Sequence, residues 1–128
     1  MSNISRILNI EDSIGKHWEI NRALEWNGYP AAELATSAEE GFSLLEKATN
    51  ENKPFGLIVL DMHFTAKGKD DTSAGLYVIE ELKRREIHIP VIVCSSRRYR
   101  IPEIAGCVFF NQTRDLNWDF REILMSLN

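Results

Sequence analysis

Two near-continuous apolar runs constrain the fold of this chain more than any other feature. They are FGLIVL, residues 55–60, and PVIVC, residues 90–94. A strand with one solvent-exposed face alternates apolar and polar residues, whereas a strand buried on both faces is apolar throughout. Both runs are therefore predicted to be central strands of a parallel sheet that helices cover on its two faces.

Amphipathic segments alternate with short apolar runs along the whole chain. This alternation is typical of an α/β fold with helices on both faces of a parallel sheet. Asn27-Gly28 is a common helix stop, and Ser37 with Glu40 forms a capping box that starts a helix. The predicted strands are 6–10, 31–35, 55–60, 90–94 and 107–110, and the predicted helices are 14–26, 37–45, 76–83 and 116–127.

The segment between the last two predicted strands, SSRRYRIPEIAG, has little helical character. Pro102 disfavours helical geometry at Ile101, while Pro102 itself suits the first position of a helix. At most about one turn of helix is predicted there.

Length and charge narrow the class of protein. With 128 residues and 44% hydrophobic residues, the chain is expected to form one domain over residues 1–128. The formal charge of −4 disfavours nucleic acid as a partner. Neither a secretory signal nor an apolar run of ~20 residues is present, so a cytoplasmic protein with no membrane contact is expected. Cys94 and Cys107 lack metal-site spacing and are predicted to be buried free thiols.

Polar side chains follow four of the predicted strands. Right-handed crossovers bring the carboxyl ends of parallel strands to one edge of the sheet, where ligands bind. A single Asp or Ser at such a position is often only a helix N-cap, a reading that stays open for Asp12 and Ser13. The residues collected at this edge are Glu11, Asp12, Ser13, Asp61, Met62, His63, Ser95, Ser96, Asn111, Gln112 and Thr113.

Three of these residues are carboxylates: Glu11, Asp12 and Asp61. Within a few ångströms of one another they would repel by ~4 kcal/mol per pair at an effective dielectric constant near 20. A divalent cation would relieve this repulsion, and hard oxygen ligands suit Mg²⁺. The sequence therefore predicts a magnesium site.

Four motifs together resemble a response-regulator receiver domain over essentially the whole chain. They are the acidic pair in ILNIEDS, the strand-end aspartate in LIVLDMHF, Gly75-Leu76 and the segment IPVIVCSS. The resemblance implies a doubly wound, flavodoxin-like sheet of five parallel strands in the order 2-1-3-4-5. The fourth helix of the family would here be shortened.

The resemblance also implies a role for each site residue. Asp61 would be the phosphoacceptor, receiving a phosphoryl group from a histidine kinase, a phosphotransfer protein or a small phosphodonor. Asp12 would ligate Mg²⁺ directly, Glu11 directly or through water, and the backbone carbonyl of His63 would be a further ligand. Ser95 would be the switch hydroxyl that turns towards the phosphoryl oxygen. Such a domain is a signalling module and not a turnover enzyme.

The chain departs from the family after the fifth strand, where receivers usually carry a lysine. Here CVFF continues as NQTRD, so Asn111, Gln112 or Thr113 takes that position, depending on the alignment. None of the three is positively charged. A neutral Asn or Gln donor is weaker than a charged one.

Two further segments are unusual for the family. The loop from Asp61 to Gly75 is longer, and it is either a solvated insertion or a source of Lys67 or Lys69 as a substitute lysine. The segment 97–100, RRYR, is either a solvated face or a partner or phosphate contact. His63 and Arg97 lie two positions past the phosphoacceptor and the switch hydroxyl, and their bulk is predicted to hinder dephosphorylation.

Other functional classes fit less well. Gly15-Lys16 resembles the end of a P-loop, but the first glycine is missing and His17 replaces the Mg²⁺-binding Ser or Thr. The main alternative is a pseudo-receiver, the same fold acting as a phosphorylation-independent interaction module. In either case the output is expected to pass by contact with another protein, from a stand-alone receiver or from an excised domain.

Overall fold

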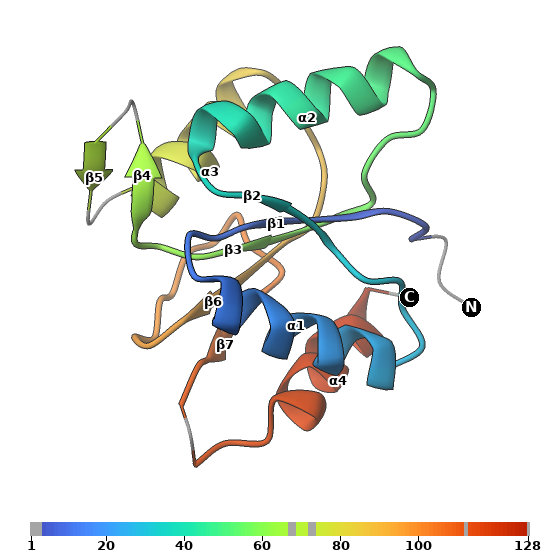
Figure 1. Ribbon diagram of the computed structural model, residues 1–128, viewed down its shortest axis with the longest axis vertical. Coiled ribbons are helices and arrows are strands. Elements are labelled where there is room, and N and C mark those ends of the chain that lie inside the picture. The colour runs from blue at the N-terminus through green and yellow to red at the C-terminus, as the bar shows by residue number, and fades with distance from the viewer. Residues whose placement is uncertain (1–3, 67–68, 72–73, 112, 128) are drawn as a thin grey trace.

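A sheet of five parallel strands forms the centre of the structure (Figure 1). The computed structural model describes residues 4–66, 69–71, 74–111 and 113–127, with only the backbone for 64–66 and 69–71. The strand order β2-β1-β3-β6-β7 is the predicted doubly wound order. These strands are β1 (Ile7–Ile10), β2 (Glu33–Ala35), β3 (Leu57–Leu60), β6 (Val91–Ser95) and β7 (Gly106–Phe109).

Two pairs of helices cover the two faces of this sheet. Helices α1 (Ile14–Trp26) and α4 (Leu116–Ser126) pack on one face, and α2 (Ala38–Asn50) and α3 (Ala74–Arg84) pack on the other (Figure 1). In β3, Leu57 faces the first pair of helices and Ile58 the second, so both faces need apolar residues. This explains the uninterrupted apolar runs. Among the described residues, the helices are too short or too polar to cross a membrane.

The strand register brings the ends of β1 and β3 to the same level. Ile10 pairs with Leu60, and the parallel ladder continues one step further on both strands. The Glu11 N–H donates to the carbonyl of Ala35, and the Asp61 N–H donates to the carbonyl of Ile10. Glu11 and Asp61 therefore leave neighbouring strands side by side.

The helix starts follow the capping residues in the sequence. The Ser37 hydroxyl accepts a hydrogen bond from the Glu40 N–H at 3.1 Å, as a capping box requires. The Glu40 carboxylate accepts a hydrogen bond from the N–H of Thr36. In a regular capping box it would accept from the N–H of the N-cap residue, Ser37. Helix α1 ends at Trp26, followed by Asn27 as its C-cap and by Gly28, whose φ of +84° favours glycine.

Two connections differ from those of a regular α/β unit. Residues 96–105, all of them described, contain turns and bends and no helix, within the limit predicted from Pro102. After Asp61, where a loop was expected, β4 (Phe64–Ala66) and β5 (Lys69–Asp71) form an antiparallel hairpin (Figure 1). The segment KDD of β5 lacks the apolar residues that marked the other strands, which is why the sequence did not predict this hairpin.

Candidate functional site

A cluster of three carboxylates lies at the carboxyl edge of the sheet. Glu11, Asp12 and Asp61 each place one carboxylate oxygen within 4.8 Å of the others. Glu11 and Asp61 are buried, and Asp12 is exposed. The predicted convergence of these three residues is thus found in the structure.

A lysine that the sequence analysis had not placed here lies inside this cluster. The Lys16 Nζ is 3.1 Å from both Glu11 Oε1 and Asp61 Oδ1, and it donates to the carbonyl oxygen of Cys94 at 2.7 Å. It also lies 5.3 Å from the centre of the Phe110 ring. The ammonium therefore joins the carboxyl ends of β1, β3 and β6 and lies close to the end of β7.

The start of α1 places Lys16 in this position. Ser13 caps the helix, and its hydroxyl accepts from the Lys16 N–H at 3.2 Å. Lys16 is thus in the first turn of α1, where a cation opposes the helix dipole and normally costs stability. The two carboxylates offset this cost.

A chain of polar contacts fixes the same turn of α1 to the sheet. His17 Nδ1 lies 2.8 Å from Asn9 Oδ1, and Asn9 Nδ2 donates to the carbonyl of Val59 at 2.9 Å. His17 Nε2 lies 3.2 Å from Asn21 Nδ2. Because the first partner is an acceptor and the second a donor, the contacts require a neutral imidazole with its proton on Nδ1. Burial lowers the pKa of His17, consistent with this neutral form.

Burial and the ion pair between Glu11 and Lys16 have opposite effects on the pKa of each residue. Burial raises the pKa of Glu11 to about 7, the nearby charge of Asp61 raises it too, and Lys16 counteracts both. Burial is the largest influence on the pKa of Lys16 and lowers it, but the charges of Glu11, Cys94 and Asp61 and the hydrogen bond to Asp61 together outweigh burial and raise this pKa. Lys16 is therefore a stable cation at neutral pH.

The two oxygens of Asp61 have different surroundings. Oδ1 accepts hydrogen bonds from Lys16 Nζ at 3.1 Å and from the Met62 N–H at 2.8 Å. Among the described residues, none donates a hydrogen bond to Oδ2. One oxygen is thus held by two donors, and the other has no donor among the described residues.

Gly75 lets the start of α3 approach Asp61 closely. Its N–H donates to the carbonyl of Met62 at 3.2 Å. A Cβ added at Gly75 would lie 2.7 Å from the Met62 Cα and 3.0 Å from the Asp61 carbonyl oxygen, too close for any side chain. The glycine of the Gly-Leu motif therefore has a steric reason: a larger residue would collide with the backbone of Asp61 and Met62.

Ser95 and His63 lie near the same edge. Ser95 is fully buried as the last residue of β6, and its hydroxyl accepts from the Arg97 N–H at 3.3 Å. His63 Nε2 lies 3.4 Å from the Tyr99 hydroxyl. This contact ties the residues that follow β3 to the arginine-rich segment 97–100.

Among the described residues, none of those considered as substitutes for the missing lysine donates a hydrogen bond to Asp61. Asn111 is exposed, and its Oδ1 accepts from both the N–H and the hydroxyl of Thr113 at 2.8 Å. Gln112, Lys67 and the side chain of Lys69 lie outside the described residues. Within the described residues, the ammonium beside Asp61 is instead that of Lys16, a residue considered only as part of a degenerate P-loop.

The residues present fit a divalent cation such as Mg²⁺. The donor set consists of hard carboxylate oxygens, which Mg²⁺ prefers. Glu11 Oε1 is buried, and apart from its ion pair with Lys16 at 3.1 Å it accepts no well-directed hydrogen bond from the described residues, so it could also serve a cation or its water. Lys16 offsets only one of the three negative charges.

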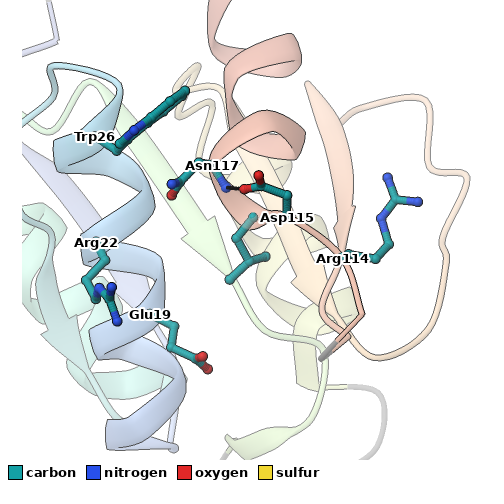
Figure 2. A pocket seen from close by; sticks show the side chains of 7 residues that line it. Glu19, Arg22, Trp26, Arg114, Asp115 and Asn117 are labelled. Atoms are coloured by element: carbon teal, nitrogen blue, oxygen red, sulfur yellow. Dashed lines mark hydrogen bonds between the residues drawn. The ribbon is translucent and has the colours of Figure 1, made fainter.

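A separate surface pocket lies between α1 and the start of α4 (Figure 2). None of the predicted site residues lines it. Beside it, the rings of Trp26 and Trp118 pack 5.7 Å apart and join the two helices. The residues that line the pocket are Glu19, Arg22, Trp26, Arg114, Asp115, Leu116 and Asn117.

Comparison with known proteins gives a likeness in structure only. No family model and no curated protein sequence matches the chain. The response regulator TrrA from Thermotoga maritima, solved with Mg²⁺-BeF, is 18% identical with a TM-score of 0.71, over 98% of this chain and 100% of that one.

Two further solved structures give the same result. A CheY-like receiver domain protein from Methanospirillum hungatei is 19% identical, with a TM-score of 0.65 over 98% of this chain and 94% of that one. A sensor protein from Polaromonas is 17% identical, with a TM-score of 0.66 over 96% of this chain and 98% of that one. The fold is therefore that of response-regulator receiver domains, as the sequence motifs predicted.

Proposed function

We propose that the protein is a receiver domain of two-component signalling, a single domain over residues 1–128 that accepts a phosphoryl group on Asp61. The observation that carries this proposal is the asymmetry of the Asp61 carboxylate. Oδ1 is held by Lys16 and Met62, and Oδ2 accepts no hydrogen bond from the described residues. A fixed carboxylate with one free oxygen is suited to in-line attack on phosphorus.

The proposed reaction is a simple transfer. Asp61 Oδ2 attacks the phosphorus of a phosphohistidine or of acetyl phosphate and forms a new O–P bond. The P–N or P–O bond to the donor breaks, and the leaving imidazole or acetate takes the bonding electron pair. The product is an acyl phosphate on Asp61, which water later hydrolyses to the free carboxylate and inorganic phosphate.

Mg²⁺ would be held by Asp12, Asp61, Glu11 directly or through water, and the backbone carbonyl of His63. When bound, it would neutralise charge on the phosphoryl oxygens during the transfer. The supporting observations are the three carboxylates within 4.8 Å and the buried Glu11 Oε1, which accepts no well-directed hydrogen bond from the described residues.

The signal would leave the domain through contacts with another protein. Ser95 would turn its hydroxyl from the Arg97 N–H towards the phosphoryl oxygen, and this change would alter the neighbouring segment 97–100. The partners would be a histidine kinase or phosphotransfer protein and a downstream protein, in the cytoplasm. The domain would not be a turnover enzyme.

Intact mass spectrometry tests the proposal directly. The protein is incubated with Mg²⁺ and acetyl phosphate, with Asp61→Asn and an excess of chelator as controls. We expect one phosphoryl adduct on the unmodified protein and none in either control. An unmodified mass under all conditions would argue against phosphoacceptance.

A pseudo-receiver is the second candidate, and one observation favours it. The Lys16 ammonium lies 3.1 Å from both Glu11 and Asp61 and already offsets part of their repulsion without a metal. The carboxylates could then persist as a structural ion cluster in an interaction module. The same mass measurement separates the two candidates, because a pseudo-receiver gains no phosphoryl group.

A further inference from the structure

We infer that Lys16, at the start of α1, is the cationic partner of the phosphoryl group on Asp61, and so replaces the lysine that the chain lacks after β7. The inference rests on the proposed phosphoacceptor function. It assigns a role in phosphoryl transfer to a lysine in α1. The resemblance to receiver domains places the corresponding lysine after the last strand of the sheet.

The position of the ammonium supports this role. The Lys16 Nζ lies 3.1 Å from Asp61 Oδ1, and the side chain is only 11% exposed. A charge held in a site sheltered from water interacts more strongly with charge that develops during transfer than a solvated one does. Within the described residues, the Lys16 ammonium is the cationic group in contact with Asp61.

Lys16 and the attacking oxygen do not compete. The ammonium contacts Oδ1, whereas attack on phosphorus uses Oδ2. Once Oδ2 carries the phosphoryl group, Oδ1 becomes the carbonyl oxygen of the acyl phosphate and loses its negative charge. The ammonium then has a weaker partner at Oδ1 and a stronger one in the new phosphoryl oxygens, so its contact shifts towards them.

The anchoring of the helix makes this lysine well positioned. The Ser13 cap and the contact of His17 with Asn9 hold the residues on both sides of Lys16 in fixed places. The Cys94 carbonyl accepts a hydrogen bond from Nζ at 2.7 Å and restricts its direction. A preorganised charge of this kind stabilises the transition state without rearrangement during the step.

Two consequences distinguish this role from a structural ion pair. Substitution of Lys16 by Met removes one positive charge next to three carboxylates, so Mg²⁺ should bind at least about 10-fold more tightly. The same substitution removes the charge that favours transfer, so phosphorylation at saturating Mg²⁺ should become about 100-fold slower. Tighter metal binding together with slower transfer is not expected from partial unfolding.

The test compares Lys16→Met and Lys16→Arg with the unmodified protein. Mg²⁺ binding is measured by isothermal titration calorimetry, and the rate of adduct formation from acetyl phosphate by intact mass at saturating Mg²⁺. Lys16→Arg keeps the charge and should recover a large part of the rate. Lys47→Met, which removes an exposed lysine on α2, is the matched control and should match the unmodified protein in both measurements.

The outcomes separate this inference from the proposed function. Adduct formation by the unmodified protein and by Lys16→Met at equal rates would overturn the inference and leave the proposed function intact. No adduct on the unmodified protein would overturn both. If Lys16→Met does not fold, Lys16→Gln, which keeps a donor without the charge, takes its place and the same comparison applies.

Discussion

Lys16 Nζ and Asp61 Oδ1 lie 3.1 Å apart, although 45 residues separate them in the chain. The contact joins the first turn of α1 to the end of β3, and the Cys94 carbonyl extends it to β6. A single side chain thus connects the three strand ends that surround the proposed phosphorylation site.

Gly75→Ala is expected to destabilise the protein by about 1–3 kcal/mol. The added Cβ would meet the Met62 Cα at 2.7 Å and the Asp61 carbonyl oxygen at 3.0 Å, and backbone atoms cannot move aside easily. The measurement is the free energy of unfolding in urea. Gly15→Ala is the matched control, since a Cβ at this helical position meets nothing within 4 Å, and it should stabilise by about 0.5–1 kcal/mol. Equal effects of the two substitutions would contradict the close approach at Gly75.

Asn9→Leu is expected to destabilise the protein by at least about 2 kcal/mol. The substitution leaves the Val59 carbonyl and the His17 Nδ1–H without the partners they have now. Chemical denaturation measures this loss. Asn50→Ala, at an exposed position of α2, is the control and should change stability by less than about 0.5 kcal/mol. A similar small change for both variants would show that the Asn9 contacts do not hold α1.

The contribution of His17 to the stability of the protein should fall on acidification, opposite in sign to that of Glu11, whose pKa is raised to about 7. The pKa of His17 is lowered in the folded state, so the unfolded chain takes up the proton first, and stability is lost as the pH falls below about 6.5. His17→Gln keeps a donor towards Asn9 and does not titrate. Thermal unfolding between pH 7.5 and pH 5 measures both proteins, with about 6.5 as the expected onset. The unmodified protein should lose more stability than His17→Gln, and parallel pH profiles would refute this prediction.

The double substitution of His63 and Arg97 by Ala should shorten the lifetime of the phosphoryl group. His63 lies two positions past Asp61 and contacts Tyr99, and Arg97 lies two positions past Ser95, whose hydroxyl accepts from the Arg97 N–H. The bulk of the two side chains is expected to hinder the attacking water. The decay of the adduct after removal of the phosphodonor is followed by intact mass. Arg100→Ala, an exposed change in the same segment, serves as the control. An unchanged lifetime in the double variant would remove the proposed shielding.

The sequence predicted the sheet because its central strands leave no ambiguity. A run such as 57–60 is apolar at every position, and only a strand covered on both faces requires this. The convergence of Glu11, Asp12 and Asp61 followed from the rule that parallel strands end at one edge. The parallel sheet and the three carboxylates thus followed from the residues, whereas the strand order was implied by the resemblance to receiver domains.

The position of Lys16 was not predicted, because a long flexible side chain can point in many directions from a helix. One observation could have indicated it: a lysine in the first turn of a helix opposes the helix dipole. Such a residue needs nearby negative charge, and Glu11 lies five positions earlier in the chain. The sequence contains no comparable indication of the β4–β5 hairpin that follows Asp61.

The most direct test of the central claim is to identify the residue that carries the phosphoryl group. After incubation with Mg²⁺ and acetyl phosphate, borohydride reduces an acyl phosphate of aspartate to homoserine, and peptide mass spectrometry locates the converted position. The account predicts homoserine at position 61, none at Asp12, and none in the sample without phosphodonor. Conversion at another carboxylate, or none at all, would contradict phosphorylation of Asp61.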